Sequence, residues 1–319
     1  MLTVSPPPEH GPAGVDGAAP PEVRRGLLIV NENARSGSTP IDEALEVLEA
    51  AGIALTRAPC TPGLTAADLI RRHGPEVDLV VVGGGDGTLN AAAPGLHETG
   101  LPLGILPLGT ANDLARTLGI KPDPVEAAAV IAAGHVRTID LGEVNGHPYF
   151  NVASIGFTAE LAQELTAEAK RRWGTLGYAL AAARLLRRMR PFRATIEHDG
   201  IRERVRTIQV SVGNGRHYGG GLTVESSAVP DDGHFDVYSL ELQHWWQLLA
   251  LTPYLKQGTH GSWREVRTIR TTALEVTTRR PMAINTDGEI KTRTPARFRV
   301  LPGAVKVFTP PPSEAAEAA

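Results

Sequence analysis

The pattern of apolar and polar positions changes once along the chain, near residue 142. From Arg25 onward, short continuous apolar runs take turns with segments of helical period. Continuous apolar runs are typical of parallel strands buried on both faces, with helices as their connections. The predicted elements, in order, are a strand at Gly26–Asn31, a helix at Pro40–Ala51, a strand at Ile53–Ala58, a helix at Thr65–His73, a strand at Val77–Val82, a helix at Leu89–Thr99, a strand at Pro102–Leu106 and a short helix ending at Leu118.

Beyond Asp140 the chain consists mainly of short β-rich runs separated by Gly, Pro and Asp turns. Such a pattern favours an antiparallel sandwich. One helical insertion, at 160–190, interrupts it. The predicted strands lie at Tyr149–Ile155, Ala194–His198, Val205–Gly213, His234–Leu240, Ala273–Thr278 and Ala296–Val300.

The fold class predicted from these patterns is α/β plus β, with a three-layer α/β domain at 23–142 and an antiparallel β-sandwich domain at 143–303. Residues 1–22 are rich in Pro, Gly and Ala and lack the basic start and apolar run of a signal peptide, so we expect a disordered tail. Residues 304–319 form a C-terminal segment and a second tail. No stretch reaches the roughly 18 apolar residues of a membrane-spanning helix.

Composition narrows the range of partners. The net charge of −3 argues against nucleic acid, because neutralising phosphates requires a broadly basic face. A single cysteine, Cys60, can form neither an intrachain disulfide nor a thiolate zinc site, which favours a reducing compartment.

A glycine-rich loop is the strongest local signal for a binding site. Residues 81–90 read VVGGGDGTLN, between a buried strand and the start of a helix. Glycine allows the backbone to approach a phosphate closely, and free N–H groups at a helix start favour an anion. The loop has neither the Walker lysine nor the spacing of the dinucleotide fingerprint. The alternative is a tight turn in which Asp86 caps the helix.

A second polar loop, Pro107–Asp113, follows the next strand and reads PLGTAND. The carboxyl ends of neighbouring parallel strands meet at one edge of a sheet, where ligands bind. We therefore expect the two loops to face one crevice.

Together the two loops resemble the catalytic domain of diacylglycerol kinases and of the related sphingosine and ceramide kinases. The pentapeptide at 84–88 also occurs in NAD kinases, whereas its combination with 107–113 is specific. The segment Asn33–Gly37 resembles the family's Asn-Pro-x-Ser-Gly loop, with Ala34 in place of proline. The resemblance extends from residue 25 to about 309 and includes Asn151–Phe157, Val212–Asn214, Asp231–Gly233 and Asp287–Glu289.

The resemblance implies that ATP binds in the cleft between a nucleotide-binding domain, 23–142, and a lipid-substrate domain, 143–303. A threonine near the second strand, Thr56 or Thr61, is also expected to contact ATP. The implied ATP contacts are Asn33, Ala34, Arg35, Ser36, Gly83, Gly84, Gly85, Asp86, Gly87, Thr88, Leu89, Asn90, Thr110 and Asn112.

Three aspartates are the expected magnesium site. In the family, residues matching Asp86, Asp113 and Asp140 form a water-mediated network with Mg²⁺, an ion that prefers oxygen ligands. For Asp113 and Asp140 the alternative is helix or turn capping.

Glu289 is the expected catalytic base, because the family's Asp-Gly-Glu glutamate takes the proton of the lipid hydroxyl. Asp86 is also expected to be a catalytic residue. From spacing alone, Asp287–Gly288 reads as a hairpin turn followed by a solvated glutamate.

A further acidic turn resembles a structural Mg²⁺ site formed by Asp232 with the carbonyls of Val229 and His234, or else is a simple β-turn.

Two segments could meet lipid. The insertion carries an apolar stretch with arginines that suit anionic headgroups, or it packs on the sandwich with a solvated basic face. Trp245 and Trp246 with Leu248–Leu251 are better explained by core packing. The arginines in the insertion and directly after it are Arg184, Arg187, Arg188, Arg190 and Arg193.

The expected function is an ATP- and Mg²⁺-dependent lipid kinase that phosphorylates a membrane lipid hydroxyl, with diacylglycerol as the expected acceptor and phosphatidic acid as product, a step of phospholipid biosynthesis. It would act in the cytoplasm, peripherally at the inner face of the membrane. Phosphatidylglycerol or a sphingoid base remain open as acceptors, and a homodimer as the assembly. The alternatives are a kinase of NAD and a non-catalytic lipid-binding module.

Overall fold

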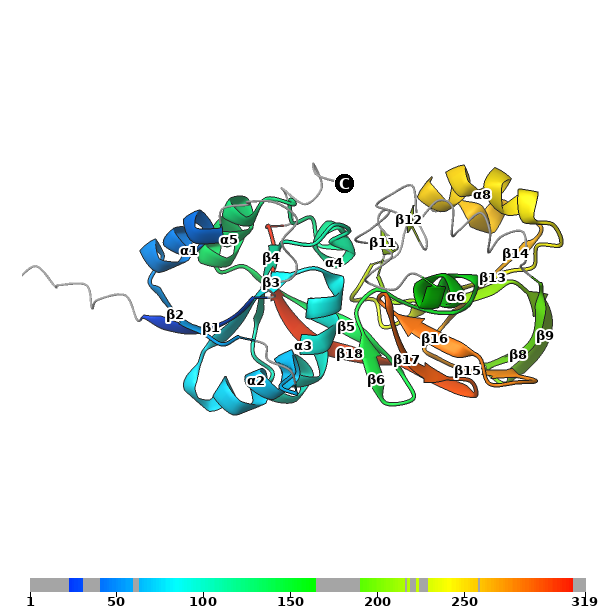
Figure 1. Ribbon diagram of the computed structural model, residues 1–319, viewed down its shortest axis with the longest axis horizontal. Helices are drawn as coiled ribbons and strands as arrows, with labels where there is room; N and C mark the ends of the chain where they lie inside the picture. The colour runs from blue at the N-terminus through cyan, green and yellow to red at the C-terminus, as the bar shows by residue number, and fades with distance from the viewer. Residues whose placement is uncertain are drawn as a thin grey trace, which may run out of the picture.

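The computed structural model describes residues 23–30, 41–59, 63–164, 190–215, 217–218, 222–223, 229–257 and 259–311. These residues form an α/β lobe and an antiparallel β lobe, which lie side by side (Figure 1). The expectations for 33–36 and for most of the insertion lie outside the described residues.

Four parallel strands form the sheet of the first lobe. They are β1 (Arg24–Val30), β2 (Ile53–Arg57), β3 (Leu79–Gly84) and β4 (Leu103–Pro107), in the order β2-β1-β3-β4. Every residue of β3 and β4 is buried, as the continuous apolar runs predict. The predicted parallel sheet is confirmed.

Helices cover both faces of this sheet (Figure 1). On one face lie α1 (Ile41–Ala50) and α5 (Pro124–Ala133), and on the other α2 (Ala66–His73) and α3 (Asp86–Thr99). The sequence pattern missed α5, although Asp123 caps it through the N–H groups of Val125 and Glu126, both at 2.9 Å. A short turn, η2 (Gly74–Glu76), follows α2, and α4 (Asp113–Thr117) follows β4.

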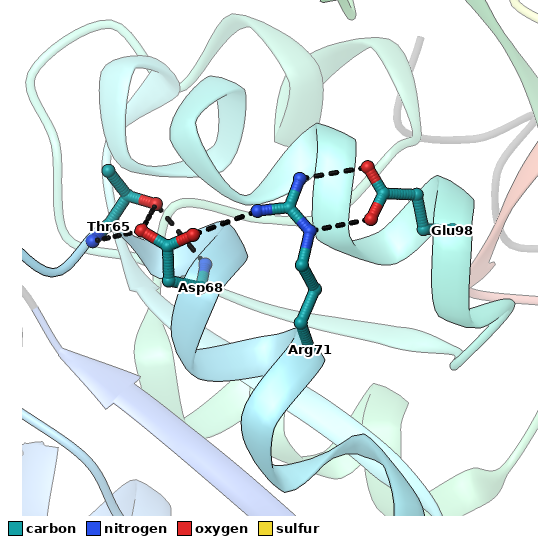
Figure 2. Close-up of polar contacts among 4 residues, drawn as sticks. All are labelled: Thr65, Asp68, Arg71 and Glu98. Carbon is teal, nitrogen blue, oxygen red and sulfur yellow. Dashed lines mark hydrogen bonds and ion pairs between the residues drawn. The ribbon is translucent and has the colours of Figure 1, made fainter.

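A polar network joins α2 to α3 on the surface (Figure 2). Thr65 and Asp68 form a capping box at the start of α2. Arg71 contacts Asp68 at 2.9 Å and binds both oxygens of Glu98 at 2.6 and 2.8 Å. Since these side chains are largely exposed, we expect the network to align the two helices rather than to stabilise them strongly.

The second lobe is a sandwich of two antiparallel layers. One layer has the order β14-β13-β10-β7-β16-β17, and the other includes β5, β6, β8, β9, β15 and part of β18. Its elements are β5 (Val136–Val144), β6 (His147–Tyr149), β7 (Val152–Gly156), β8 (Phe192–His198), β9 (Ile201–Thr207), β10 (Gln209–Gly213), β13 (Phe235–Leu240), β14 (Val266–Thr271), β15 (Ala273–Thr278), β16 (Ala283–Thr286), β17 (Glu289–Arg293) and β18 (Ala296–Phe308). Side chains from both layers, Ile155, Ile196 and Phe235 among them, form one core. The predicted sandwich is confirmed.

The strand β18 connects the two lobes. Its first half pairs with β15 and β5 in the sandwich, and Val307 pairs with Leu103 of β4 in the first lobe. The strand therefore continues to Phe308, eight residues past the predicted Val300, because Val305 and Val307 are buried in the core of the first lobe. One ten-stranded sheet runs through both lobes.

Helix α8 (Trp245–Gln257) covers the outer face of the sheet that contains β13. Leu248 and Leu251 are buried there, as the expected core packing of this segment requires, but Trp246 is 54% exposed, so the expectation is wrong for that residue. The remaining elements are α6 (Phe157–Glu164), β11 (His217–Tyr218), β12 (Leu222–Thr223) and η3 (His260–Ser262). Among the helices that the structure describes, none has the length and apolar character needed to cross a membrane.

Candidate active site

The glycine-rich loop forms a tight passage from β3 into α3. Gly85 is the N-cap residue in an extended conformation, and Asp86 is the first residue of the helix. A Cβ atom added to Gly84 would lie 2.5 Å from Thr88 Oγ1, so the loop has no room for a side chain there. Asp86 does not cap α3. Its Oδ1 instead accepts a hydrogen bond from the N–H of Leu114, at the start of α4, at 3.1 Å.

The second loop is fixed by Asn112. This residue has a left-handed backbone, with φ of 52°, which asparagine tolerates better than most residues. Its side chain accepts from the N–H of Gly109 at 3.0 Å and donates to the carbonyl of Gly109 at 2.9 Å. Thr110 is exposed at the tip, and Asp113 is buried as the first residue of α4.

The two loops lie against each other at the carboxyl edge of the sheet. The N–H of Leu108 donates to the carbonyl of Gly84 at 3.0 Å. A Cβ atom on Gly109 would lie 2.5 Å from the Cα of Gly85, so the backbones touch only because both residues are glycine. The two loops therefore lie together at this edge, as expected, and the crevice between them stays a prediction.

A hairpin of the second lobe faces this edge. Asp287 and Gly288 connect β16 to β17 with φ of 47° and 95°, as in a two-residue turn of the type that Asp-Gly predicts. Glu289 follows the turn, and a Cβ atom on Gly87 would lie 3.6 Å from its Oε1. Asn90 Nδ2, one turn further along α3, donates to the carbonyl of Thr286 at 3.4 Å.

Glu289 is partly solvated, with 45% of its side chain exposed. Its Oε2 forms an ion pair with Lys291 Nζ at 2.5 Å. The two residues are two positions apart on β17, so their side chains leave the same face of the strand. Lys291 was not among the predicted site residues, although its spacing of two from Glu289 can be read from the sequence.

Asp287 has a structural role that its place in a turn did not reveal. Its carboxylate accepts from the backbone N–H groups of Phe150 at 2.8 Å, Asn151 at 3.1 Å and Val152 at 3.0 Å. Burial raises the pKa of Asp287 to about 7; the negative charge of Asp86 adds to this rise, and the three N–H donors oppose it. The partners are backbone groups more than a hundred positions away, so no sequence motif could identify them.

Asp140 makes the hydrogen bonds that its capping alternative describes, and its part in the water-mediated Mg²⁺ network stays a prediction. Its Oδ2 accepts from the N–H of Gly233 and its Oδ1 from the N–H of Gly303, both at 2.8 Å. The carboxylate is buried and connects β5 to the acidic turn and to β18. Asn214 adds to the same junction by donating to the carbonyl of Asp140 at 3.0 Å.

The acidic turn is held by arginines. Asp231 pairs with Arg137 through two bonds of 2.7 and 2.8 Å. Asp232 accepts from the N–H of His234 at 2.9 Å and from Arg270 Nη2 at 2.9 Å. Val229 is exposed next to this turn. A structural Mg²⁺ at this turn stays a prediction, and Arg270 is already a counterion of Asp232.

The described residues contain no group of three His, Cys, Asp or Glu side chains that could bind a metal directly. Asp86 and Asp113 begin α3 and α4 at the touching loops, whereas Asp140 lies at the junction described above. Carboxylate oxygens fit Mg²⁺, which commonly keeps several waters and contacts one or two carboxylates. The water-mediated network therefore stays a prediction that the chemistry of Asp86 and Asp113 suits.

Two domain families match the chain. Residues 25–144 match the diacylglycerol kinase catalytic domain, and residues 151–309 match the YegS C-terminal NAD kinase beta sandwich-like domain. The first match contains both glycine loops, and the second contains the hairpin with Glu289. The fold and the site therefore define a class of two-domain proteins in which a kinase catalytic domain precedes a β-sandwich.

Relatives of known name agree with this class. A "Probable lipid kinase YegS-like" from Stenotrophomonas maltophilia (strain K279a) is 34% identical over 75% of this chain and 80% of its own length. The diacylglycerol kinase of Bacillus subtilis (strain 168) is 30% identical over 74% of this chain and 78% of its own. The crystal structure of a diacylglycerol kinase from Bacillus anthracis str. Sterne superposes with a TM-score of 0.73 at 25% identity, over 90% of this chain and 97% of that chain. The chain belongs to the diacylglycerol kinase family.

Proposed function

We propose that this protein is a lipid kinase that transfers the γ-phosphate of ATP to the hydroxyl of diacylglycerol, with phosphatidic acid and ADP as products. The names of its relatives support the class of reaction. The observation that carries the proposal is the position of Glu289, which projects from the second lobe toward the first turn of α3. An acid from one domain thus meets a phosphate-binding loop from the other.

The loop around Gly85 suits the phosphates of ATP. No side chain caps the start of α3, so its first N–H groups can donate to oxygen anions, and the glycines allow close approach. Mg²⁺ bound with ATP would supply neutralisation of phosphate charge. Asp86 and Asp113 would hold it through water, while Asp140 would act indirectly by fixing the junction between the lobes.

Glu289 is proposed to act as the base. Its carboxylate would accept the proton of the lipid hydroxyl as the hydroxyl oxygen forms a bond to the γ-phosphorus and the bond from that phosphorus to ADP breaks. Lys291 binds Oε2 and so orients the carboxylate with Oε1 toward Gly87. Since the acceptor is a membrane lipid and ATP is cytoplasmic, the reaction would occur peripherally at the inner face of the membrane.

The proposal is tested by incubating the protein with labelled ATP and Mg²⁺ and with diacylglycerol, phosphatidylglycerol or sphingosine in mixed micelles, in parallel with NAD. Label on diacylglycerol supports the proposal, and label on another lipid corrects the acceptor. Label on NAD would indicate a dinucleotide kinase. ATP binding without transfer to any acceptor would indicate the non-catalytic module.

A further inference from the structure

Helix α8 differs from an ordinary surface helix in its charge. A helix on the surface of a protein usually buries an apolar stripe and exposes charged residues. The 13 residues of α8, WWQLLALTPYLKQ, include one charged residue, Lys256, and no acid. The buried stripe is present, since Leu248, Leu251 and Leu255 pack on the sandwich.

The outward face of α8 is uncharged at every position whose exposure the structure describes. Its exposed residues are Trp246, Ala250, Pro253, Tyr254 and Gln257. Trp246, Ala250 and Tyr254 are spaced by four, so they follow one line along the helix. Trp246 is 54% exposed and Tyr254 is 40% exposed. We call Trp246 and Tyr254 the aromatic ridge.

Neighbouring side chains support the ridge. Tyr254 packs edge-on against Trp263, with ring centroids 5.3 Å apart, and Trp246 stacks with His244 at 6.1 Å. The rings are therefore held in place while most of the Trp246 surface faces outward.

A series of contacts runs from the aromatic ridge to the edge of the first lobe that carries the two glycine loops. Helix α8 contacts β12, β12 pairs with β11, and β11 contacts α4. Figure 1 shows α4, β11, β12 and α8 in succession along the same side of the molecule. Asp113, the first residue of α4, lies at the proposed ATP site. A surface that binds α8 would thus lie along the same side of the molecule as α4.

We propose that the aromatic ridge of α8 inserts into the interface of a lipid bilayer and holds the catalytic cleft against the membrane, an inference that rests on the proposed lipid kinase function. Tryptophan and tyrosine concentrate at the boundary between headgroups and acyl chains, because each has an apolar ring and a polar atom. The absence of acidic residues in α8 removes repulsion from anionic headgroups. Binding through uncharged rings depends little on salt, unlike binding through a basic patch.

The test compares the parent protein with the double variant Trp246→Ser/Tyr254→Ser in co-sedimentation with phosphatidylcholine vesicles, without ATP, at low and high salt. The control is Ile201→Ser, which removes a side chain that is 53% exposed on β9. We expect vesicle binding of the double variant to weaken by about tenfold for each ring removed, and salt to change the binding of the parent little. Binding of the control should match the parent.

Three results would overturn the inference. The first is a parent that fails to bind vesicles, and the second is a double variant that binds them as the parent does. The third result is a loss of vesicle binding that accompanies dissociation of a dimer, measured by sedimentation equilibrium, which would make the ridge a protein contact. Circular dichroism confirms that the variant is folded.

A kinase assay separates this inference from the function itself. The double variant should lose activity on diacylglycerol embedded in vesicles and keep activity on a short-chain, dispersed diacylglycerol. If the parent phosphorylates no lipid while the variant still loses vesicle binding, the kinase proposal fails and the ridge remains a lipid-binding surface. Equal loss on both acceptors would contradict the role of the ridge.

Discussion

Glu289 and Gly87 face each other across the two lobes, with Glu289 Oε1 3.6 Å from where a Cβ atom of Gly87 would lie. The hydrogen bond from Asn90 to Thr286 brings the same hairpin to the same helix. The first turn of α3, which suits a phosphate, therefore lies beside an acidic side chain from the sandwich.

Gly87 should tolerate one added atom and no more. A Cβ atom at 3.6 Å from Glu289 Oε1 is ordinary contact, so Gly87→Ala should fold about as stably as the parent. Gly87→Val places methyl groups between α3 and Glu289 and should lower kcat strongly. Steady-state kinetics of both variants provide the measurement, and equal activity of the two would show that the space beside Glu289 is not used.

Gly109→Ala should disrupt the contact between the loops. The added Cβ atom would lie 2.5 Å from the Cα of Gly85 and 2.7 Å from Asn112 Oδ1, so the backbone must shift. We expect a loss of about 1–3 kcal/mol in the free energy of unfolding and weaker ATP binding. Urea unfolding and ATP titration of the variant and of the parent check this. Unchanged stability would mean that the loops adjust freely.

Asp287 should make stability depend on pH. Its pKa is raised from 3.8 to about 7 in the folded protein, so between these values the folded state binds more protons than the unfolded state. The free energy of unfolding is then predicted to fall as pH rises from about 4 to about 7. Urea unfolding across this range should give a flatter profile for Asp287→Asn, which cannot titrate. The same slope in the variant would assign the effect to other groups.

Asp140 should contribute to stability even without ATP or Mg²⁺. Asp140→Ala removes the acceptor of the N–H groups of the half-buried Gly233 and the exposed Gly303, and we expect a total cost of about 1–3 kcal/mol because water can reach at least one of them. Asp231→Ala is the comparison, because its pair with Arg137 is partly exposed and should contribute less than about 1 kcal/mol. Unfolding by urea without Mg²⁺ measures both. An Asp140 variant that is destabilised only when Mg²⁺ is present would favour a direct metal role.

The local signals in the chain were sufficient for the parallel sheet, the sandwich and the two glycine loops. Continuous apolar runs predict β3 and β4, and Asp287–Gly288 predicts the hairpin, because both depend on neighbouring residues. The bonds of Asp287 to 150–152 and of Asp140 to Gly233 and Gly303 join residues far apart in sequence. The passage of β18 through both lobes likewise depends on packing in the first lobe. Periodicity carries no information on such long-range pairs.

In the proposed reaction, Glu289 takes the proton of the lipid hydroxyl. The most direct measurement is the rate of transfer from labelled ATP to diacylglycerol by Glu289→Gln, beside its affinity for ATP. Glu275→Gln changes an acid on β15 whose side chain is 36% exposed and pairs with Arg297 at 3.0 Å, and it is the matched control. A general base contributes roughly 10²- to 10⁴-fold, so the Glu289 variant should lose at least about a hundredfold in rate while it binds ATP as the parent does. Near-normal transfer by this variant would contradict the account.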